Sequence, residues 1–207
     1  QVIQQGKREG INSEKLAVLE SRLNRASISL TEHSNKAAPA PAQEQMRSLF
    51  DLYQSGQQQQ AEKLAESLTR TFPEHPFAWK VLGALLKDTG RAREALSANQ
   101  KCVQLSPSDA EAFNNLGSTL KDLGRLEEAV INYRKAIALQ PLIAAVHGNL
   151  GATLHALGRL EDAESSYQRA LSLNPESAES HNNMGLLLRE LGKIEEASAS
   201  HKRAIAI

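Results

Sequence analysis

The chain has 207 residues, with 24 basic and 24 acidic side chains, so its formal net charge is zero. This balance argues against a general nucleic-acid binder, which needs a surplus of basic residues to displace counterions, and against a polybasic membrane anchor. A single cysteine excludes an intramolecular disulfide and a cysteine-rich zinc site, and no apolar run reaches the roughly 18 residues that cross a bilayer.

Residues 1–41 form a separate N-terminal region. Within residues 13–32, apolar side chains recur at the alternating spacing of three and four that predicts a helix with one apolar seam. They are Leu16, Leu19, Leu23, Ala26 and Leu30. Residues 33–41, rich in alanine and proline, predict an extended linker. The helix is expected to dock on the segment that follows, and a small dimerisation element is the alternative.

From Ala42 the sequence repeats with a period of 34 residues. It gives five rows, 42–75, 76–109, 110–143, 144–177 and 178–207, of which the last is incomplete. Positions within a row are numbered here as columns. Column 11 is always leucine, column 15 always glycine and column 20 always alanine, while column 8 is glycine in four rows and column 32 is proline in the four complete rows. Such agreement indicates a structural repeat.

Each row predicts two amphipathic helices, called helix A and helix B. Gly124 lies between them and can adopt the left-handed conformation that ends helix A. The small Gly117 and Ala129 allow the two helices to approach closely, and Pro141 ends helix B. A basic residue follows helix A and acidic residues open helix B, which complements the helix dipoles and favours a structural role for this charge column. The basic residues are Arg91, Arg125, Arg159 and Lys193.

These residues resemble the tetratricopeptide repeat (TPR) family. Row three supplies the motif residues Phe113, Leu116, Gly117, Leu120, Ala129, Tyr133, Ala136 and Pro141. Row two supplies Trp79, Leu82, Gly83, Leu86, Ala95 and Pro107. Row one departs from the pattern, with Gln45, Ser48 and Leu49 at motif positions. The resemblance covers residues 42–207 and implies an all-α solenoid, a right-handed superhelix of antiparallel helix pairs with about five repeats, preceded by the N-terminal helix.

In this family the A helices line a concave groove, and column 6 is among the columns that face it. That column holds Asn115, Asn149 and Asn183, whose amides can both donate and accept hydrogen bonds to a peptide unit. The row resembles the asparagine row in the TPR superhelix of O-GlcNAc transferase. The alternative is that these amides bond only a neighbouring helix or water. Further predicted groove residues are Lys80, Asn114, Lys121, His155, Asn182 and Arg189.

The carboxylate clamp of chaperone-binding TPR domains is matched only in part. Lys80 and Asn115 fit it, whereas Ala84, Ala145 and Asn149 do not. Without its other cations, a clamp loses charge-assisted bonds to a terminal carboxylate. Binding of chaperone tails is therefore disfavoured.

Catalytic and metal-binding patterns are not recognisable in the sequence. Cys102 occupies a small column and is expected to be a buried apolar residue, and His147 and His181 are expected to pack in column 4. The other histidines, His33, His75, His155 and His201, have no acidic or cysteine partner at ligand spacing. We expect no catalytic residue, no metal site and no cofactor in this chain.

The sequence thus predicts a scaffold that binds an extended peptide or protein partner in the groove, with no nucleic acid and no membrane. One alternative is the substrate-recruiting N-terminal arm of a larger bacterial enzyme, because the rows also resemble the N-terminal arrays fused to bacterial glycosyltransferases, sulfotransferases or methyltransferases, and the last row stops inside a helix B. Another is self-assembly into a homo-oligomer through the N-terminal helix or an array end. A cytoplasmic location is expected.

Overall fold

The computed structural model describes residues 40–207. The helix predicted for residues 13–32, the linker as far as residue 39, and the docking or dimerisation of that helix lie outside the described residues. Residues 41–207 form one compact unit.

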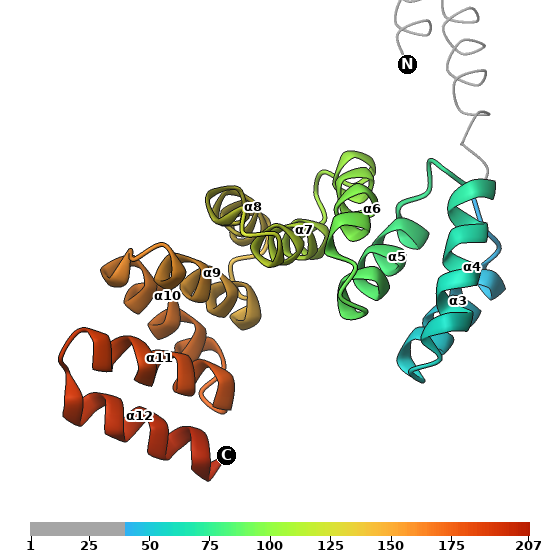
Figure 1. Cartoon of the computed structure of the whole chain (residues 1–207). Helices are drawn as coiled ribbons and strands as arrows, with labels where there is room; N and C mark the ends of the chain where they lie inside the picture. Colours follow the sequence, from blue (N-terminus) through green and yellow to red (C-terminus); the bar gives the residue numbers. More distant parts are fainter. Residues whose placement is uncertain (1–39) are drawn as a thin grey trace, which may run out of the picture. The chain divides into compact units, whose positions relative to one another are not determined.

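Residues 40–207 fold into ten α-helices and contain no strand. Consecutive helices pair as A and B within each row, which confirms the predicted all-α solenoid (Figure 1). The A helices are α3 (Gln43–Gln54), α5 (Pro76–Asp88), α7 (Ala110–Asp122), α9 (Ala144–Ala156) and α11 (Ala178–Glu190). The B helices are α4 (Gln58–Thr71), α6 (Ala92–Leu105), α8 (Leu126–Leu139), α10 (Leu160–Leu173) and α12 (Ile194–Ala206).

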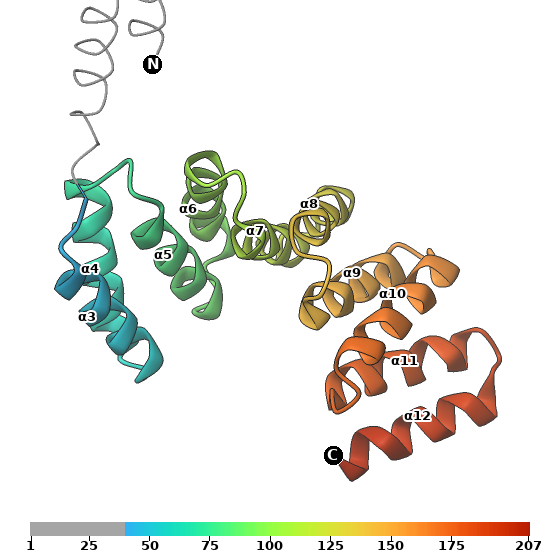
Figure 2. The ribbon, with the colours of Figure 1, turned by 180° about the vertical axis from the view of Figure 1, so that it is seen from behind.

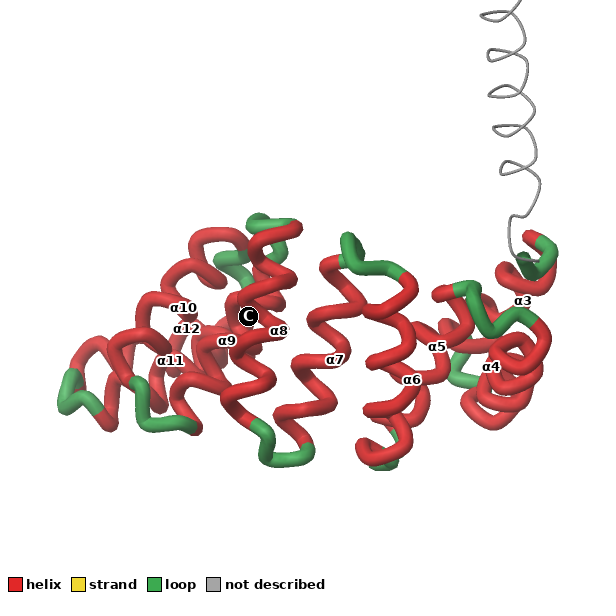
Figure 3. Tube along the Cα trace, turned by 90° about the horizontal axis from the view of Figure 1, so that it is seen from above, coloured by secondary structure: helices red, strands yellow, loops and turns green. Residues whose placement is uncertain are grey.

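The array is curved, and the A helices form its inner side. Each A helix contacts the A helix of the next repeat, whereas no two B helices of the described unit contact each other. When the helices of a stack touch on one side and lie apart on the other, the stack curves towards the side on which they touch. Figures 1 and 2 show this bend, with α5, α7 and α9 inside α6, α8 and α10. Seen from above, the helices lie side by side along the array (Figure 3).

The turn between helices A and B is built on glycine, as Gly124 illustrates. Its φ of 74° is left-handed, a conformation that costs other residues about 1–2 kcal/mol. The Gly124 N–H donates to the carbonyl of Lys121 and the Arg125 N–H donates to that of Leu120, both at 2.9 Å. These are the two bonds of a Schellman motif, so the column 11 leucine contributes a carbonyl as well as a buried side chain.

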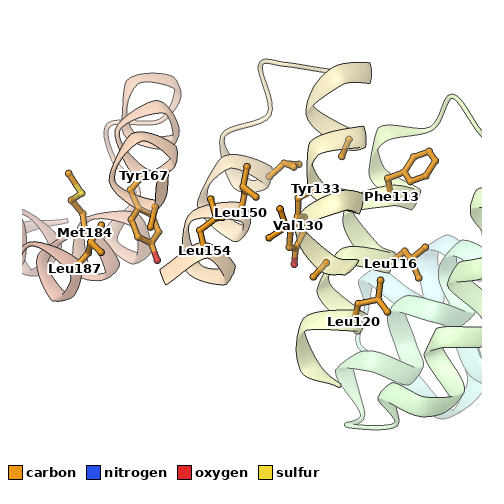
Figure 4. Packing of buried hydrophobic residues seen from close by; sticks show 14 of the residues in the cluster. Phe113, Leu116, Leu120, Val130, Tyr133, Leu150, Leu154, Tyr167, Met184 and Leu187 are labelled. Carbon is orange, nitrogen blue, oxygen red and sulfur yellow. The ribbon is translucent and has the colours of Figure 1, made fainter. Parts of the chain in front are cut away.

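Close helix approach comes from pairing a glycine in column 8 with a large residue in column 24. A Cβ on Gly117 would lie 2.8 Å from the ring of Tyr133, which is fully buried. Figure 4 shows Tyr133 and Tyr167 among the core leucines. Row one reverses the pair, because Leu49 fills column 8 and Ala65 fills column 24, both with no exposed surface. Its departure from the motif is thus compensated within the same helix pair.

The basic residue after helix A has a structural role, as predicted. Arg125 donates from Nε and Nη2 to the two carboxylate oxygens of Glu128, each at 2.7 Å, and this pairing lowers the pKa of Glu128. Arg91 bonds Glu94 and also Glu62 of the preceding repeat. Because the Arg125–Glu128 and Arg91–Glu94 pairs are largely exposed, each contributes little stability, but they link the end of one helix to the start of the next. The Arg91–Glu62 pair is more enclosed and joins neighbouring repeats.

Candidate functional site

The three column 6 asparagines lie one per A helix on α7, α9 and α11, and all three are partly buried. Asn149 donates from Nδ2 to Oδ1 of Asn114, at 3.0 Å, which joins column 6 of one helix to column 5 of the helix before it. The Asn115 and Asn183 amides make no hydrogen bond with other residues of the described range. The alternative of a bond to a neighbouring helix is met by one Nδ2 donor of Asn149, whose Oδ1 has no hydrogen bond within residues 40–207.

Lys80, predicted as a groove cation, is instead enclosed by carboxylates of its own chain. Its Nζ lies 2.8 Å from Asp109 Oδ2 and 2.8 Å from Glu111 Oε2. Burial lowers the pKa of Lys80, but the hydrogen bonds and negative charges of Asp109 and Glu111 outweigh it and raise the pKa above its ordinary value. The ammonium is thus neutralised locally, which weakens the one cation that matched a carboxylate clamp.

His155 has an acidic partner that sequence spacing did not indicate. Its Nε2 lies 2.8 Å from Glu190 Oε2, on the next A helix. Tyr53 of column 12 likewise bonds Asp88, the column 13 residue of the second repeat. Lys121, also in column 12, has no ion pair within residues 40–207.

The remaining predicted groove residues are Asn182 and Arg189, both exposed on α11. Neither side chain forms a hydrogen bond or ion pair within residues 40–207. All predicted groove residues thus lie on A helices. Lys80 is on α5, and the others are on α7, α9 and α11.

A cavity of about 120 Å³ lies between α9 and α11. Small and polar side chains line it, because column 5 of α9 is Gly148 where the neighbouring repeats have Asn114 and Asn182. The lining consists of Ala144, Ala145, Gly148, Asn149, Asn174, Ser177, Glu179, Ser180 and Asn183. Two of the three column 6 asparagines thus border a hollow that sequence analysis did not predict.

The column 4 residues pack, as predicted, and also hold the turns between repeats. His147 Nε2 lies 3.0 Å from the carbonyl of Pro141, and His181 Nε2 lies 2.9 Å from that of Pro175. A carbonyl only accepts, so Nε2 carries the proton in each imidazole. Trp79 donates its indole N–H to Pro73 in the same way, at 2.9 Å. These side chains are therefore occupied by structural bonds.

Cys102 has no exposed surface, which confirms the expected packing role. Burial raises the pKa of its thiol from 9.0 to about 11, with a smaller contribution from the charge of Asp109. At pH 8 the thiolate fraction is then about a hundredfold below that of an ordinary cysteine. We expect Ellman's reagent to label the native chain at least tenfold more slowly than the chain in urea. Equal rates in both states would show that Cys102 is accessible.

Within residues 40–207, no group of three or more His, Cys, Asp or Glu side chains is arranged to hold a metal ion. In the same range, every helix is too short or too polar to pass through a bilayer.

Comparison with protein families gives two matching models, both described as tetratricopeptide repeat. One matches residues 51–110, and the other matches residues 108–176 and 142–207. Comparison with curated protein sequences gives no match.

Solved structures share the fold at low sequence identity. A MamA structure from Desulfovibrio magneticus RS-1 is 19% identical, with a TM-score of 0.69, over 78% of this chain and 94% of that one. TTC0263, a thermophilic TPR protein in Thermus thermophilus, is 24% identical, with a TM-score of 0.67, over 79% and 90%. Pseudomonas aeruginosa pilF is 20% identical, with a TM-score of 0.71, over 78% and 74%. At these identities the similarity concerns the fold.

Proposed function

Because the chain belongs to the tetratricopeptide repeat family, whose members are protein-interaction scaffolds, we propose that its inner face holds an extended segment of a partner protein. The observation that carries this proposal is the row of Asn115, Asn149 and Asn183 on consecutive inner helices, whose side-chain amides make a single hydrogen bond within residues 40–207, from Asn149 to Asn114.

The spacing of this row suits an extended backbone. Packed helices lie about 8–10 Å apart, and an extended chain rises about 3.3 Å per residue, so successive asparagines address about every third peptide unit. An amide side chain can accept from the peptide N–H and donate to the peptide carbonyl. Contacts of this kind recognise the peptide groups and not the side chains of the partner. The groove therefore selects a segment mainly by its extended conformation.

The charges favour an internal segment over a C-terminal tail. A free carboxylate needs unpaired cations, and Lys80 is already held by Asp109 and Glu111. Lys121 and Arg189 lie two repeats apart, too far along the array to act as one clamp. The partner segment thus passes through the groove instead of ending in it.

The test is a selection on the full 207-residue chain from bead-displayed random nine-residue peptides with blocked termini. We expect enrichment of peptides that bind at the inner face, detected as shifts of the side-chain amide NMR signals of Asn115, Asn149 and Asn183. Enriched peptides that shift only B-helix signals, or a library from which nothing is enriched, would refute the proposal.

A further inference from the structure

The cavity between α9 and α11 has an occupied equivalent elsewhere in the array. Sequence positions 68 residues apart are related by two steps of the 34-residue repeat, so Gly148 corresponds to Lys80. By the same relation Ser177 corresponds to Asp109, and Glu179 corresponds to Glu111. The helix pair α5 and α7 therefore shows what the corresponding space between α9 and α11 can hold.

At α5 and α7 a lysine side chain fills this space. The Lys80 ammonium bridges Asp109 and Glu111 at 2.8 Å to each, and its side chain is 25% exposed. Asp109 also caps α7 by accepting from the backbone N–H of Glu111 at 2.9 Å. The site thus combines a helix cap with a carboxylate from the first turn, and both face the ammonium.

At α9 and α11 the same helix geometry remains, but the lysine is missing. Ser177 keeps the capping role and accepts from the Ser180 N–H at 3.2 Å. Glu179 keeps the first-turn carboxylate, which has no ion pair within residues 40–207. Gly148 contributes no side chain, and the cavity of about 120 Å³ occupies the vacated space.

The groups that line the cavity suit a primary ammonium. Glu179 supplies negative charge, and the Asn183 amide and the free Oδ1 of Asn149 supply neutral acceptors. The cavity lining contains no basic side chain. An ammonium has three donors that can point to separate acceptors, whereas a guanidinium is planar and needs acceptors in a fixed fork.

We propose that this cavity is a specificity pocket that receives a lysine side chain of the bound segment. The inference rests on the proposed function, because the lysine enters as part of a peptide that lies along the inner face. The pocket adds side-chain selection at one position to a groove that otherwise reads backbone.

The probes are fluorescein-labelled versions of an enriched nine-residue peptide that carry lysine, arginine or norleucine at the selected position. With the full chain, we expect about tenfold weaker binding of the norleucine peptide than of the lysine peptide. Glu179→Gln should remove this preference by weakening only the lysine peptide. Glu176→Gln, which changes an exposed carboxylate outside the cavity lining, is the matched control and should leave both affinities unchanged.

Gly148 offers a second test, because an added Cβ meets only ordinary contacts, at 3.5 Å from Ser180 Oγ. Gly148→Ala should keep the preference for lysine, whereas Gly148→Lys should fill the pocket and abolish it. Enriched peptides that bind the inner face with no lysine preference, or a preference unchanged in Glu179→Gln, would overturn the pocket and leave the proposed function standing. A library from which nothing is enriched would overturn both.

Discussion

We expect Gly117→Leu to destabilise the array by about 3 kcal/mol and Tyr133→Ala by about 3–5 kcal/mol, whereas the two changes together should cost less than about 1.5 kcal/mol. The first change forces a side chain into the Tyr133 ring, which lies 2.8 Å from the position of its Cβ. The second leaves a cavity where a fully buried ring was. Combined, they recreate the arrangement of Leu49 and Ala65 in row one, where the large residue comes from helix A.

Free energies of unfolding from urea titrations, followed by circular dichroism, measure this coupling. Hydrogen exchange in α7 and α8 should accompany them, since repeat arrays can unfold in parts. Gly148→Ala serves as the control because its added Cβ meets only ordinary contacts, so this variant measures the cost of replacing an A-helix glycine without a steric clash. If the losses of unfolding free energy in the two single variants simply add in the double variant, residues 117 and 133 do not together set the helix spacing.

The helix pairs were predictable because the repeat displays their packing in sequence. The column 15 glycine, the column 32 proline and the A-helix leucines each follow from local backbone geometry or from burial. The glycine and the column 11 leucine recur in all five rows, and the proline recurs in the four complete rows. Row one was harder to predict, because Leu49 replaces the column 8 glycine and, taken alone, indicates a helix pair that cannot pack closely. Its compensation by Ala65 becomes visible only when the two columns are read as a contacting pair.

The site was less predictable because its contacts cross between repeats. Lys80 meets Glu111, and His155 meets Glu190, at sequence separations of 31 and 35 residues that depend on how helices stack. Reading columns 12 and 13 across consecutive rows would have found the second pair. The cavity beside Gly148 exists because this position has no side chain, and the repeat motif does not include this column.

Two alternatives, the arm of a larger bacterial enzyme and a self-assembly module, stay predictions.

Replacing Asn115, Asn149 and Asn183 together by alanine is expected to weaken peptide binding at least a hundredfold. Each lost hydrogen-bonding side chain costs about 1–1.5 kcal/mol, and three such losses correspond to about two to three powers of ten in affinity. Stability should change little, because these side chains are partly exposed and only Asn149 makes a hydrogen bond to another described side chain, that of Asn114.

The matched control replaces three exposed column 25 residues on the B helices, which lie on the outer side of the array. They are Gln100, Arg134 and Gln168. Like the asparagines, they are polar and recur once per repeat, so their replacement by alanine tests whether any periodic polar loss weakens binding.

Isothermal titration of one enriched nine-residue peptide into the full-length wild type, the asparagine variant and the column 25 variant tests the central claim most directly. A groove that holds an extended backbone through its asparagines predicts a loss of at least a hundredfold in the asparagine variant and unchanged affinity in the control. Equal affinity in all three proteins, with each shown to be folded by circular dichroism, would contradict it.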